Sequence, residues 1–288
     1  MTCIEFGPRA ERRHSPWSVL LHHSLETTKE PRRKIPCFEL STSSQNYFTF
    51  CDDPRSSGMP SPLPLLEPGK AVRITATPLT SASFAEFGSV ISSPLSPEVN
   101  ILPDLPKHPQ SQPPPVVANQ STALKYAPIS LFTDSYHDAP SRKPSKPLLS
   151  LFSSFPRPLD ANGAFTVDIL ERHPFTSQTF TPLGFSYSDS SALFLVIVAP
   201  TRSGSSAADV LSPPDLKTVK AFIGRAGQAV TYASGTWHSP MVVVGRRRVD
   251  FVVTQFVNGV KEEDYQEVQI RGGITVQGTS QRVAMSKL

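Results

Sequence analysis

The chain has 288 residues, of which 38% are hydrophobic and 18% are charged, so it is long enough for one or two domains with an apolar core. The formal net charge is only +4, and no stripe of Lys and Arg alternates with aromatic residues, which argues against a nucleic-acid partner. The longest apolar run, residues 192–199, is far shorter than the ~20 residues needed to cross a bilayer, which argues against a membrane partner.

The beginning of the chain differs from the rest. Residues 1–69 show no sustained period, are dense in Ser, Pro and Arg, and hold all three cysteines, Cys3, Cys37 and Cys51. We expect a low-order N-terminal extension here, and an incorrect gene start remains the alternative. Because residues 52–288 contain no cysteine, a disulfide framework is excluded for the main body, and a reducing compartment is expected.

Residues 70–275 are expected to form one domain of many short strands with few helices. Phe84, Phe87 and Val90 recur at spacing three and predict a short helix, and 215–224, introduced by two prolines, is expected to be another. Strands are expected at 71–77, 122–136, 148–157, 164–172, 176–184, 192–199, 228–245, 247–257 and 265–270, with Pro-rich loops at 92–115 and 138–147. This spacing is typical of a β-sandwich or a small barrel.

Two stretches place polar residues where strands are expected. In 227–238 the pattern is G-x5-A-x-G-x2-H, in which a glycine turn at Gly235 delivers His238 to an inward-facing strand. In 170–184, Glu171 and His173 stand two residues apart and therefore face the same side of a strand, while Arg172 faces the other side. Charged groups on a buried strand are costly unless they are paired or bind something. These stretches therefore predict a polar pocket inside the barrel.

The two patterns resemble the two motifs of the cupin superfamily, with Ala233 where a proline is usual and Gln178 at the position of an acid. The resemblance implies a cupin-like β-barrel or jelly roll, in which these positions are metal ligands. A divalent transition metal is thus a possible cofactor, with Glu171, His173, Gln178 and His238 as its ligands. A pocket that keeps the hydrogen bonds but has no metal is the open alternative.

Further motifs narrow the resemblance. The stretches 171–174 (ERHP), 178–182 (QTFTP), 237–240 (WHSP) and 247–251 (RRVDF) occur in the order typical of the ureidoglycolate lyase family. Residues 119–126 (NQSTALKY) also resemble a family motif, although Ser121 replaces a glycine. The resemblance covers about 71–270. It implies cleavage of (S)-ureidoglycolate to glyoxylate and urea in allantoin and purine degradation, and a homodimer as the assembly.

The reaction implied by the resemblance needs a base, a cation for the substrate carboxylate and hydrogen-bonding groups for the ureido end. His238 and His173 are the candidate bases, because imidazole titrates near neutral pH. Glu171 either orients a histidine or shares the metal. The remaining substrate contacts are assigned to Lys125 for the carboxylate, to Asn119, Gln178 and Tyr232 for the ureido group, and to Trp237 and Phe180 as walls. For Trp237 and Phe180, the alternative is that they are aromatic residues of the hydrophobic core.

Arg172 is expected to be a structural residue, since alternation turns it away from Glu171 and His173. We expect it to form an ion pair with Asp250. The arginines at 246–248 are interpreted as a solvated hairpin tip or as salt-bridge partners.

Other functions remain open from the residues. One is hydrolysis of ureidoglycolate with release of ammonia, and another is a metal-dependent oxygenase or isomerase of the cupin type acting on another small acid. A sugar- or protein-binding module is disfavoured, because an acid and two histidines at ligand spacing are unusual for such a pocket.

Residues 276–288 are expected to be a flexible tail that ends in Ser286, Lys287 and Leu288. This tripeptide is a peroxisomal address when it is C-terminal, so the import receptor is an expected partner. Peroxisomal localisation is expected, with the cytoplasm as the alternative.

Overall fold

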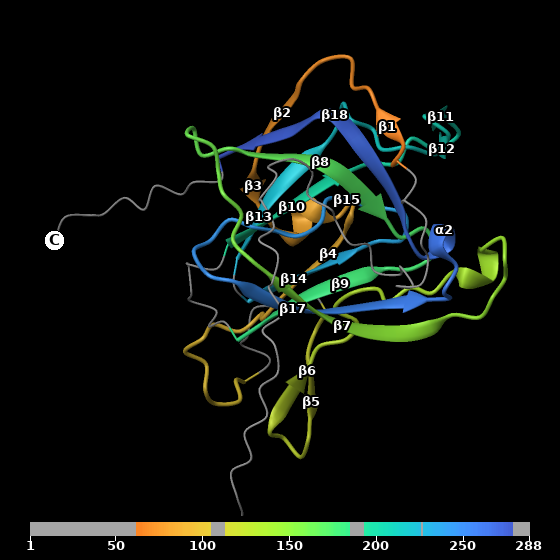
Figure 1. Ribbon diagram of the computed structural model, residues 1–288. Helices are drawn as coiled ribbons and strands as arrows, with labels where there is room; N and C mark the ends of the chain where they lie inside the picture. The colour runs from red at the N-terminus through yellow and green to blue at the C-terminus, as the bar shows by residue number, and fades with distance from the viewer. Residues whose placement is uncertain (1–61, 105–112, 185–192, 226, 279–288) are drawn as a thin grey trace, which may run out of the picture. The chain divides into compact units, whose positions relative to one another are not determined.

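The computed structural model describes residues 62–104, 113–184, 193–225 and 227–278 (Figure 1). The expected extension at 1–69 lies almost wholly outside the described residues, and so does the expected targeting tripeptide at 286–288. Strands dominate the described part, which confirms the prediction of a mainly β protein with a few short helices. No helix in this part is long and apolar enough to cross a membrane.

The larger sheet, called sheet A, holds nine strands of the described chain. Its path runs β1-β18-β8-β15-β10-β13-β3, with β2 paired to β18 and β16 paired to β10. The neighbours β18–β8, β8–β15, β15–β10 and β10–β13 are antiparallel. The strands are β1 (Leu65–Leu66), β2 (Val72–Thr75), β3 (Thr77–Pro78), β8 (Phe165–Arg172), β10 (Leu193–Ala199), β13 (Lys220–Arg225), β15 (Trp237–His238), β16 (Val242–Val243) and β18 (Gln266–Gln277).

The smaller sheet, called sheet B, holds five antiparallel strands in the order β4-β14-β9-β17-β7. They are β4 (Gly88–Ser92), β7 (Lys146–Ser154), β9 (Gln178–Leu183), β14 (Gln228–Tyr232) and β17 (Val249–Val257). Figure 1 shows the β14, β9, β17 and β7 ribbons beneath those of sheet A, so the domain is a two-layer β structure. Two small hairpins pair with no strand of either sheet: β5 (Val116–Ala118) with β6 (Ala123–Lys125), and β11 (Ser206–Ala207) with β12 (Val210–Leu211).

Apolar side chains from both sheets form the core between the layers. Phe194 of β10 meets Phe251 of β17 edge to face, with ring centroids 5.4 Å apart. The alternate residues of β10, Leu195 and Ile197, belong to a second apolar cluster on the other side of sheet A. Because both faces of β10 are buried, this strand is a continuous apolar run rather than an alternating one.

Close packing in this core leaves no room for a side chain at position 224, which is a glycine. A Cβ on Gly224 of β13 would lie only 2.2 Å from Cε2 of the Phe194 ring. Phe194 is 1% exposed and packed against Phe251, so its ring has little room to move. Gly224 is therefore required for the contact between β10 and β13.

The helices are short, as expected, but one expected helix is absent. The helix predicted from Phe84, Phe87 and Val90 is only partly correct: α1 (Ser81–Phe84), capped by the Thr80 side chain, ends at Phe84, and Val90 lies in β4. The helix predicted at 215–224 is wrong, because a turn leads directly into β13, whose central residues are buried beside β10. Pairing with a buried strand outweighs local propensity there. The other described helices are η2 (Tyr136–Asp138), a 3-10 turn, and α2 (Lys261–Asp264).

Only part of the strand expected at 122–136 forms. Residues Ala123–Lys125 make β6, and the chain from 126 to 135 is irregular apart from one bridge between Asp134 and Thr176. The expected strands from 148 onward otherwise have counterparts in the two sheets. The fold thus brings the ends of β8 and β15, from sheet A, close to β9, β14 and β17, from sheet B.

Candidate active site

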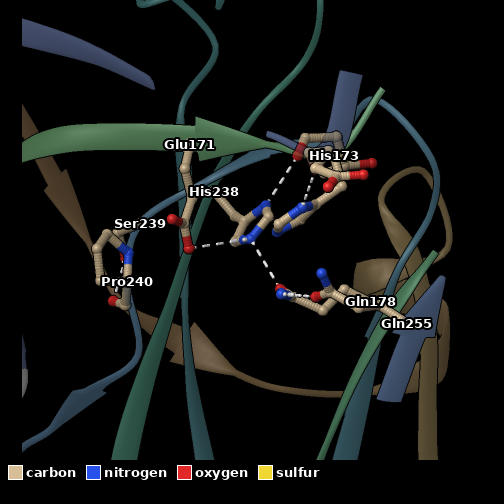
Figure 2. Close-up of polar contacts among 9 residues, drawn as sticks. Glu171, His173, Gln178, His238, Ser239, Pro240 and Gln255 are labelled. Carbon is tan, nitrogen blue, oxygen red and sulfur yellow. Dashed lines mark hydrogen bonds and ion pairs between the residues drawn. The ribbon is translucent and has the colours of Figure 1, made fainter. Parts of the chain in front are cut away.

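Glu171 and His238 face each other because their strands are neighbours in sheet A. The register of β8 and β15 pairs these two residues directly, and Oε1 of Glu171 lies 3.6 Å from Nε2 of His238. His173 follows the end of β8, and its ring centroid is 5.6 Å from that of His238. One ligand-type atom from each of the three residues lies within 4.8 Å of the other two (Figure 2). The spacing expected from the sequence is thus realised in space.

A glycine turn aligns the two halves of this cluster. Gly235 has φ +77°, in the left-handed region that favours glycine, just before β15 begins. Its backbone N–H donates to the carbonyl of His173 at 2.8 Å. The turn therefore ties the end of β8 to the start of β15 and sets where His238 emerges.

Both histidines are held through Nδ1 by backbone carbonyls. Nδ1 of His173 lies 2.7 Å from the carbonyl oxygen of Asp264, and Nδ1 of His238 lies 2.9 Å from that of Thr236. A carbonyl can only accept, so each Nδ1 carries the proton when the ring is neutral. Each Nε2 then points into the cluster with a lone pair, which is the tautomer required of a base or of a metal ligand.

Sheet B closes the other side of the pocket. The Tyr232 ring, from β14, stacks on the His238 ring with centroids 3.9 Å apart and an interplanar angle of 12°. Gln178, the first residue of β9, has its amide oxygen 3.2 Å from Nε2 of His238. Its amide nitrogen donates to the side-chain oxygen of Gln255 on β17 at 2.6 Å (Figure 2). Two polar amides thus line the wall opposite the acid and the imidazoles.

The pocket is rich in hydrogen-bond acceptors. The two Nε2 atoms, a carboxylate oxygen of Glu171 and the amide oxygen of Gln178 are all of acceptor type. Nε2 of His173 is buried and has no hydrogen-bond partner among the described residues. Such a set is satisfied by a proton on the carboxyl group, by a cation, or by a ligand that brings N–H or O–H donors.

The protonation states follow from burial. Burial, together with the nearby charge of Glu267, raises the pKa of Glu171 to about 8. Burial, and then the positive charge that His173 would carry, lowers the pKa of His238 to about 3, against the hydrogen bond to Thr236. Burial also lowers the pKa of His173. An ion pair would shift the pKa values of Glu171 and His238 the opposite way, so near pH 7 the pair is a neutral acid beside a neutral base.

The same residues fit a divalent transition metal. A carboxylate and two imidazoles with free Nε2 atoms form a typical ligand set, and backbone carbonyls orient both rings through Nδ1. The unpartnered Nε2 of His173 is the atom that a metal would satisfy. Gln178 adds a weaker oxygen donor. The predicted ligand set therefore lies together.

The expected ion pair between Arg172 and Asp250 is wrong. Arg172 is turned away from the pocket, as alternation predicted, and its guanidinium donates to the side-chain oxygen of Gln266 at 2.6 and 2.9 Å. Asp250 instead accepts from Arg248 at 2.8 Å, since both lie at the same end of sheet B. Arg172 is a structural residue, but its partners are uncharged.

Trp237 does not line the pocket. It precedes His238 in β15, so its side chain takes the opposite face of the strand and joins the second apolar cluster. Its ring lies 4.6 Å beneath the guanidinium of Arg172, and its Nε1 donates to the carbonyl of Ser212. Trp237 is therefore a core aromatic residue, which was the alternative interpretation of the sequence. Phe180, which was expected as the other wall, is also a core residue and packs on Tyr232 and Phe251.

Asn119 and Lys125 lie outside this cluster. Both belong to the β5–β6 hairpin, where Asn119 begins the turn with φ +50° and Lys125 ends β6. Both side chains are exposed, and the hairpin pairs with no strand of either sheet. Figure 1 shows the hairpin extending from the sheet B side, beyond β7. Of the nine expected site residues, five lie together: Glu171, His173, Gln178, Tyr232 and His238. Trp237 and Phe180 are core residues, and Asn119 and Lys125 stand apart.

Two residues near the pocket were missed. Gln255 follows Phe251 and Val253 on the inward face of β17, so a polar residue at an inward position was visible in the sequence. Asp264, whose carbonyl holds His173, had no such signal, because the partner of a backbone carbonyl at the end of a short helix depends on the fold.

Comparisons with known proteins agree on one family. The family model described as "Ureidoglycolate lyase" matches residues 71–277. The "Ureidoglycolate lyase" of Schizosaccharomyces pombe is 36% identical over 200 residues, covering 68% of this chain and 91% of that protein. The protein of that name from Saccharomyces cerevisiae is 34% identical over 194 residues, covering 63% and 85%. The Burkholderia mallei protein of the same name is 31% identical over 185 residues, covering 62% and 80%.

Among solved structures, the formate complex of Lactobacillus farciminis oxalate decarboxylase aligns with 48% of this chain and 30% of its own. The sequence identity is 14% and the TM-score is 0.22. A likeness at that level supports neither the fold nor the function, which rest on the sheets and the site of this chain.

Proposed function

Because this chain belongs to the ureidoglycolate lyase family, we propose that the pocket of Glu171, His173 and His238 is where it cleaves ureidoglycolate to glyoxylate and urea. The enzyme is a lyase, as its relatives are named. The observation that carries the proposal is the unpartnered, buried Nε2 of His173, which faces the acid and the second imidazole.

The chemistry is the collapse of a carbinolamide. The hydroxyl group of the substrate loses its proton to a base, and the oxygen lone pair forms the aldehyde C=O bond of glyoxylate. The C–N bond breaks, its electrons remain on nitrogen, and the nitrogen takes up a proton to give urea. A base and an acid near neutrality are therefore both needed.

In the metal-free pocket these roles match the protonation states. We assign the base to Nε2 of His173, which has no hydrogen-bond partner in the described part of the chain, with His238 as the second candidate. The carboxyl group of Glu171, protonated near pH 7, is assigned as the acid that delivers a proton to the leaving nitrogen. The proton count closes when the histidine returns its proton to Glu171.

The acceptor-rich walls suit a ureido group. Urea-type N–H groups are donors, and the amide oxygens of Gln178 and Gln255 are acceptors that can receive them. Tyr232 fixes the plane of the His238 ring by stacking on it. A metal bound by Glu171, His173 and His238 would supply Lewis-acid polarisation of a substrate oxygen.

The substrate carboxylate also needs a cation. Lys125 remains the proposed partner, and we propose that it acts from the second copy of a homodimer, since its hairpin lies apart from the two sheets. Val116 and Val117 of the same hairpin are 65% and 40% exposed, an apolar surface that a second copy would cover. Asn119 at the hairpin turn would accompany Lys125.

Mixing two inactive variants tests the shared site. Lys125→Ala and His238→Ala are each expected to be nearly inactive alone. Random exchange of subunits makes about half of the dimers mixed, each with one intact site, so about a quarter of wild-type activity returns. If Lys125 served its own subunit, mixing would restore nothing. A monomer in solution would also remove the shared site while leaving the reaction in place.

Product analysis tests the reaction itself. Purified protein and (S)-ureidoglycolate are expected to yield glyoxylate and urea in equal amounts, faster than spontaneous decay. Ammonia and carbon dioxide in place of urea would instead identify a hydrolase. No turnover of ureidoglycolate, with turnover of another small acid that requires iron or manganese, would favour an oxygenase or isomerase.

We further propose delivery to the peroxisome through Ser286, Lys287 and Leu288. A fluorescent fusion that keeps these residues at its C-terminus is expected to accumulate in peroxisomes. Removal of the three residues is expected to leave it in the cytoplasm, and an identical distribution of both fusions would contradict the proposal.

A further inference from the structure

A buried acid holds the carbonyl that orients His173. Asp264, at the end of α2, is 3% exposed, and its carboxylate accepts three hydrogen bonds of 2.8 Å. The donors are the Tyr136 hydroxyl and the Asn258 N–H to Oδ1, and the Gly259 N–H to Oδ2. A side chain fixed by three donors leaves its own backbone little freedom. The Asp264 carbonyl, which receives Nδ1–H of His173 at 2.7 Å, is therefore held in one place.

The neighbouring acid anchors the same segment. Glu263 is also buried and accepts from the backbone N–H and the hydroxyl of Ser141, at 2.7 and 2.6 Å. The Asn258 amide donates to Glu263 as well, at 2.7 Å. These hydrogen bonds lower the pKa of Glu263, so it remains an acceptor at neutral pH. Glu263 thus fastens α2 to Ser141, and Asp264 fastens it to Tyr136.

Tyr136 directly follows a short segment, residues 133–135, which we call the strap and which pairs with residues 175–177. Residues 133–135 run beside 175–177, with the Ser135 N–H donating to the Phe175 carbonyl at 2.7 Å and the Thr133 N–H donating to the Ser177 hydroxyl at 2.8 Å. This strap covers the link between His173 and Gln178. Tyr136 follows it directly, with 2% of its surface exposed.

The Tyr136 hydroxyl lies between two segments that carry pocket residues. It is 2.8 Å from the Asp264 carboxylate and 3.2 Å from the carbonyl of Phe256, the residue after Gln255. Burial and then Asp264 raise the pKa of Tyr136, so the hydroxyl keeps its proton and stays a donor. Neither partner of this hydroxyl belongs to the cluster of Glu171, His173 and His238.

We propose that Tyr136 and Asp264 are positioning residues, which fix the backbone carbonyl that keeps His173 in its Nδ1–H tautomer with Nε2 open to the substrate. They act through His173 and do not contact the reacting atoms. For the activity measurement this inference rests on the proposed function, whereas the tautomer itself is observable without any substrate.

The test compares two tyrosine-to-phenylalanine variants. Tyr136→Phe removes only the hydroxyl, and the Asp264 carboxylate keeps its two backbone donors, so the protein is expected to fold. Tyr265→Phe is the matched control, because the Tyr265 hydroxyl is buried without a hydrogen-bond partner in the described structure. Urea denaturation of both variants establishes the folded state before the other measurements.

The primary readout is the His173 ring, observed by long-range ¹H–¹⁵N NMR on protein treated with a chelator. The resonances are identified by their loss in His173→Gln. Wild type and Tyr265→Phe are expected to show a single Nδ1–H tautomer, and Tyr136→Phe a mixture with the Nε2–H form. A single, unchanged tautomer in Tyr136→Phe would overturn the inference.

The second readout is the split between kcat and KM. Tyr136→Phe is expected to lower kcat about tenfold with KM within about twofold, because fewer molecules present the reactive lone pair. Tyr265→Phe is expected to stay within about twofold in both parameters. Equal losses of kcat in the two variants would reveal a general packing effect and contradict the positioning role. Absence of ureidoglycolate turnover in wild type would refute the proposed function alone, since the NMR result stands separately.

Discussion

Glu171→Gln is expected to change how stability depends on pH. The Glu171 carboxyl group is partly buried, with 22% of its side chain exposed, and its pKa is raised from 4.5 to about 8. The folded state therefore binds one proton more than the unfolded state between those values. Stability therefore falls as pH rises through this window. A glutamine has nearly the same shape but does not titrate, so the variant lacks this contribution.

The magnitude follows from the shift. One pKa unit corresponds to about 1.4 kcal/mol, so a shift of about 3.5 units amounts to roughly 5 kcal/mol over the whole window. Below pH 6.5 the lowered pKa values of His173 and His238 act in the opposite sense, because the unfolded state then binds the extra protons. Between pH 6.5 and 8 Glu171 dominates this pocket, and wild type is expected to lose about 2 kcal/mol relative to Glu171→Gln.

Urea denaturation of both proteins in chelator, at intervals between pH 6.5 and 8, measures this difference directly. The chelator matters because a bound cation would itself lower the pKa of the carboxyl group. Parallel stability curves for wild type and Glu171→Gln would show that the group is already ionised in the folded protein. The assignment of Glu171 as a proton donor near pH 7 would then be untenable.

Gly224→Ala is expected to cost about 1–3 kcal/mol of unfolding free energy, because the new Cβ would overlap the Phe194 ring, and an unchanged urea midpoint would show that the ring can move. Arg172→Met should lower stability by about 1–3 kcal/mol by removing the donors that a partly buried set of acceptors now receives, while KM stays within about twofold; a large rise in KM at unchanged stability would place Arg172 on the substrate. Mn²⁺ added to chelator-treated protein is expected to raise the melting temperature of wild type but not of His238→Ala, and equal shifts in both would remove this set as the metal site.

Local rules located most of the site from the sequence. Strand alternation put Glu171 and His173 on one face, and the glycine turn at Gly235 delivered His238 beside them. The same alternation places Trp237 opposite His238, so its position in the core was foreseeable. Gln255 was foreseeable for the same reason, as a polar residue on the inward face of β17.

Other features depend on contacts between distant segments. Residues 215–224 begin with a sequence typical of a helix. Their second half forms β13 instead, because it pairs with the buried strand β10. Lys125 sits in a motif typical of the family, yet nothing local indicates that its hairpin stands apart from both sheets. The hydrogen bond from His173 Nδ1 to the Asp264 carbonyl joins residues 91 positions apart. Its acceptor is a backbone atom, so no pattern of side chains in the sequence indicates it.

The central claim is that the neutral acid and the two imidazoles of this pocket cleave ureidoglycolate. Its most direct test is the rate of glyoxylate release from (S)-ureidoglycolate by wild type, Glu171→Gln and His238→Ala at pH 7, with spontaneous decay subtracted. Wild type is expected to exceed spontaneous decay by orders of magnitude, and each variant to lose at least about a hundredfold in kcat. Variants as active as wild type, or a wild type no faster than spontaneous decay, would contradict the account.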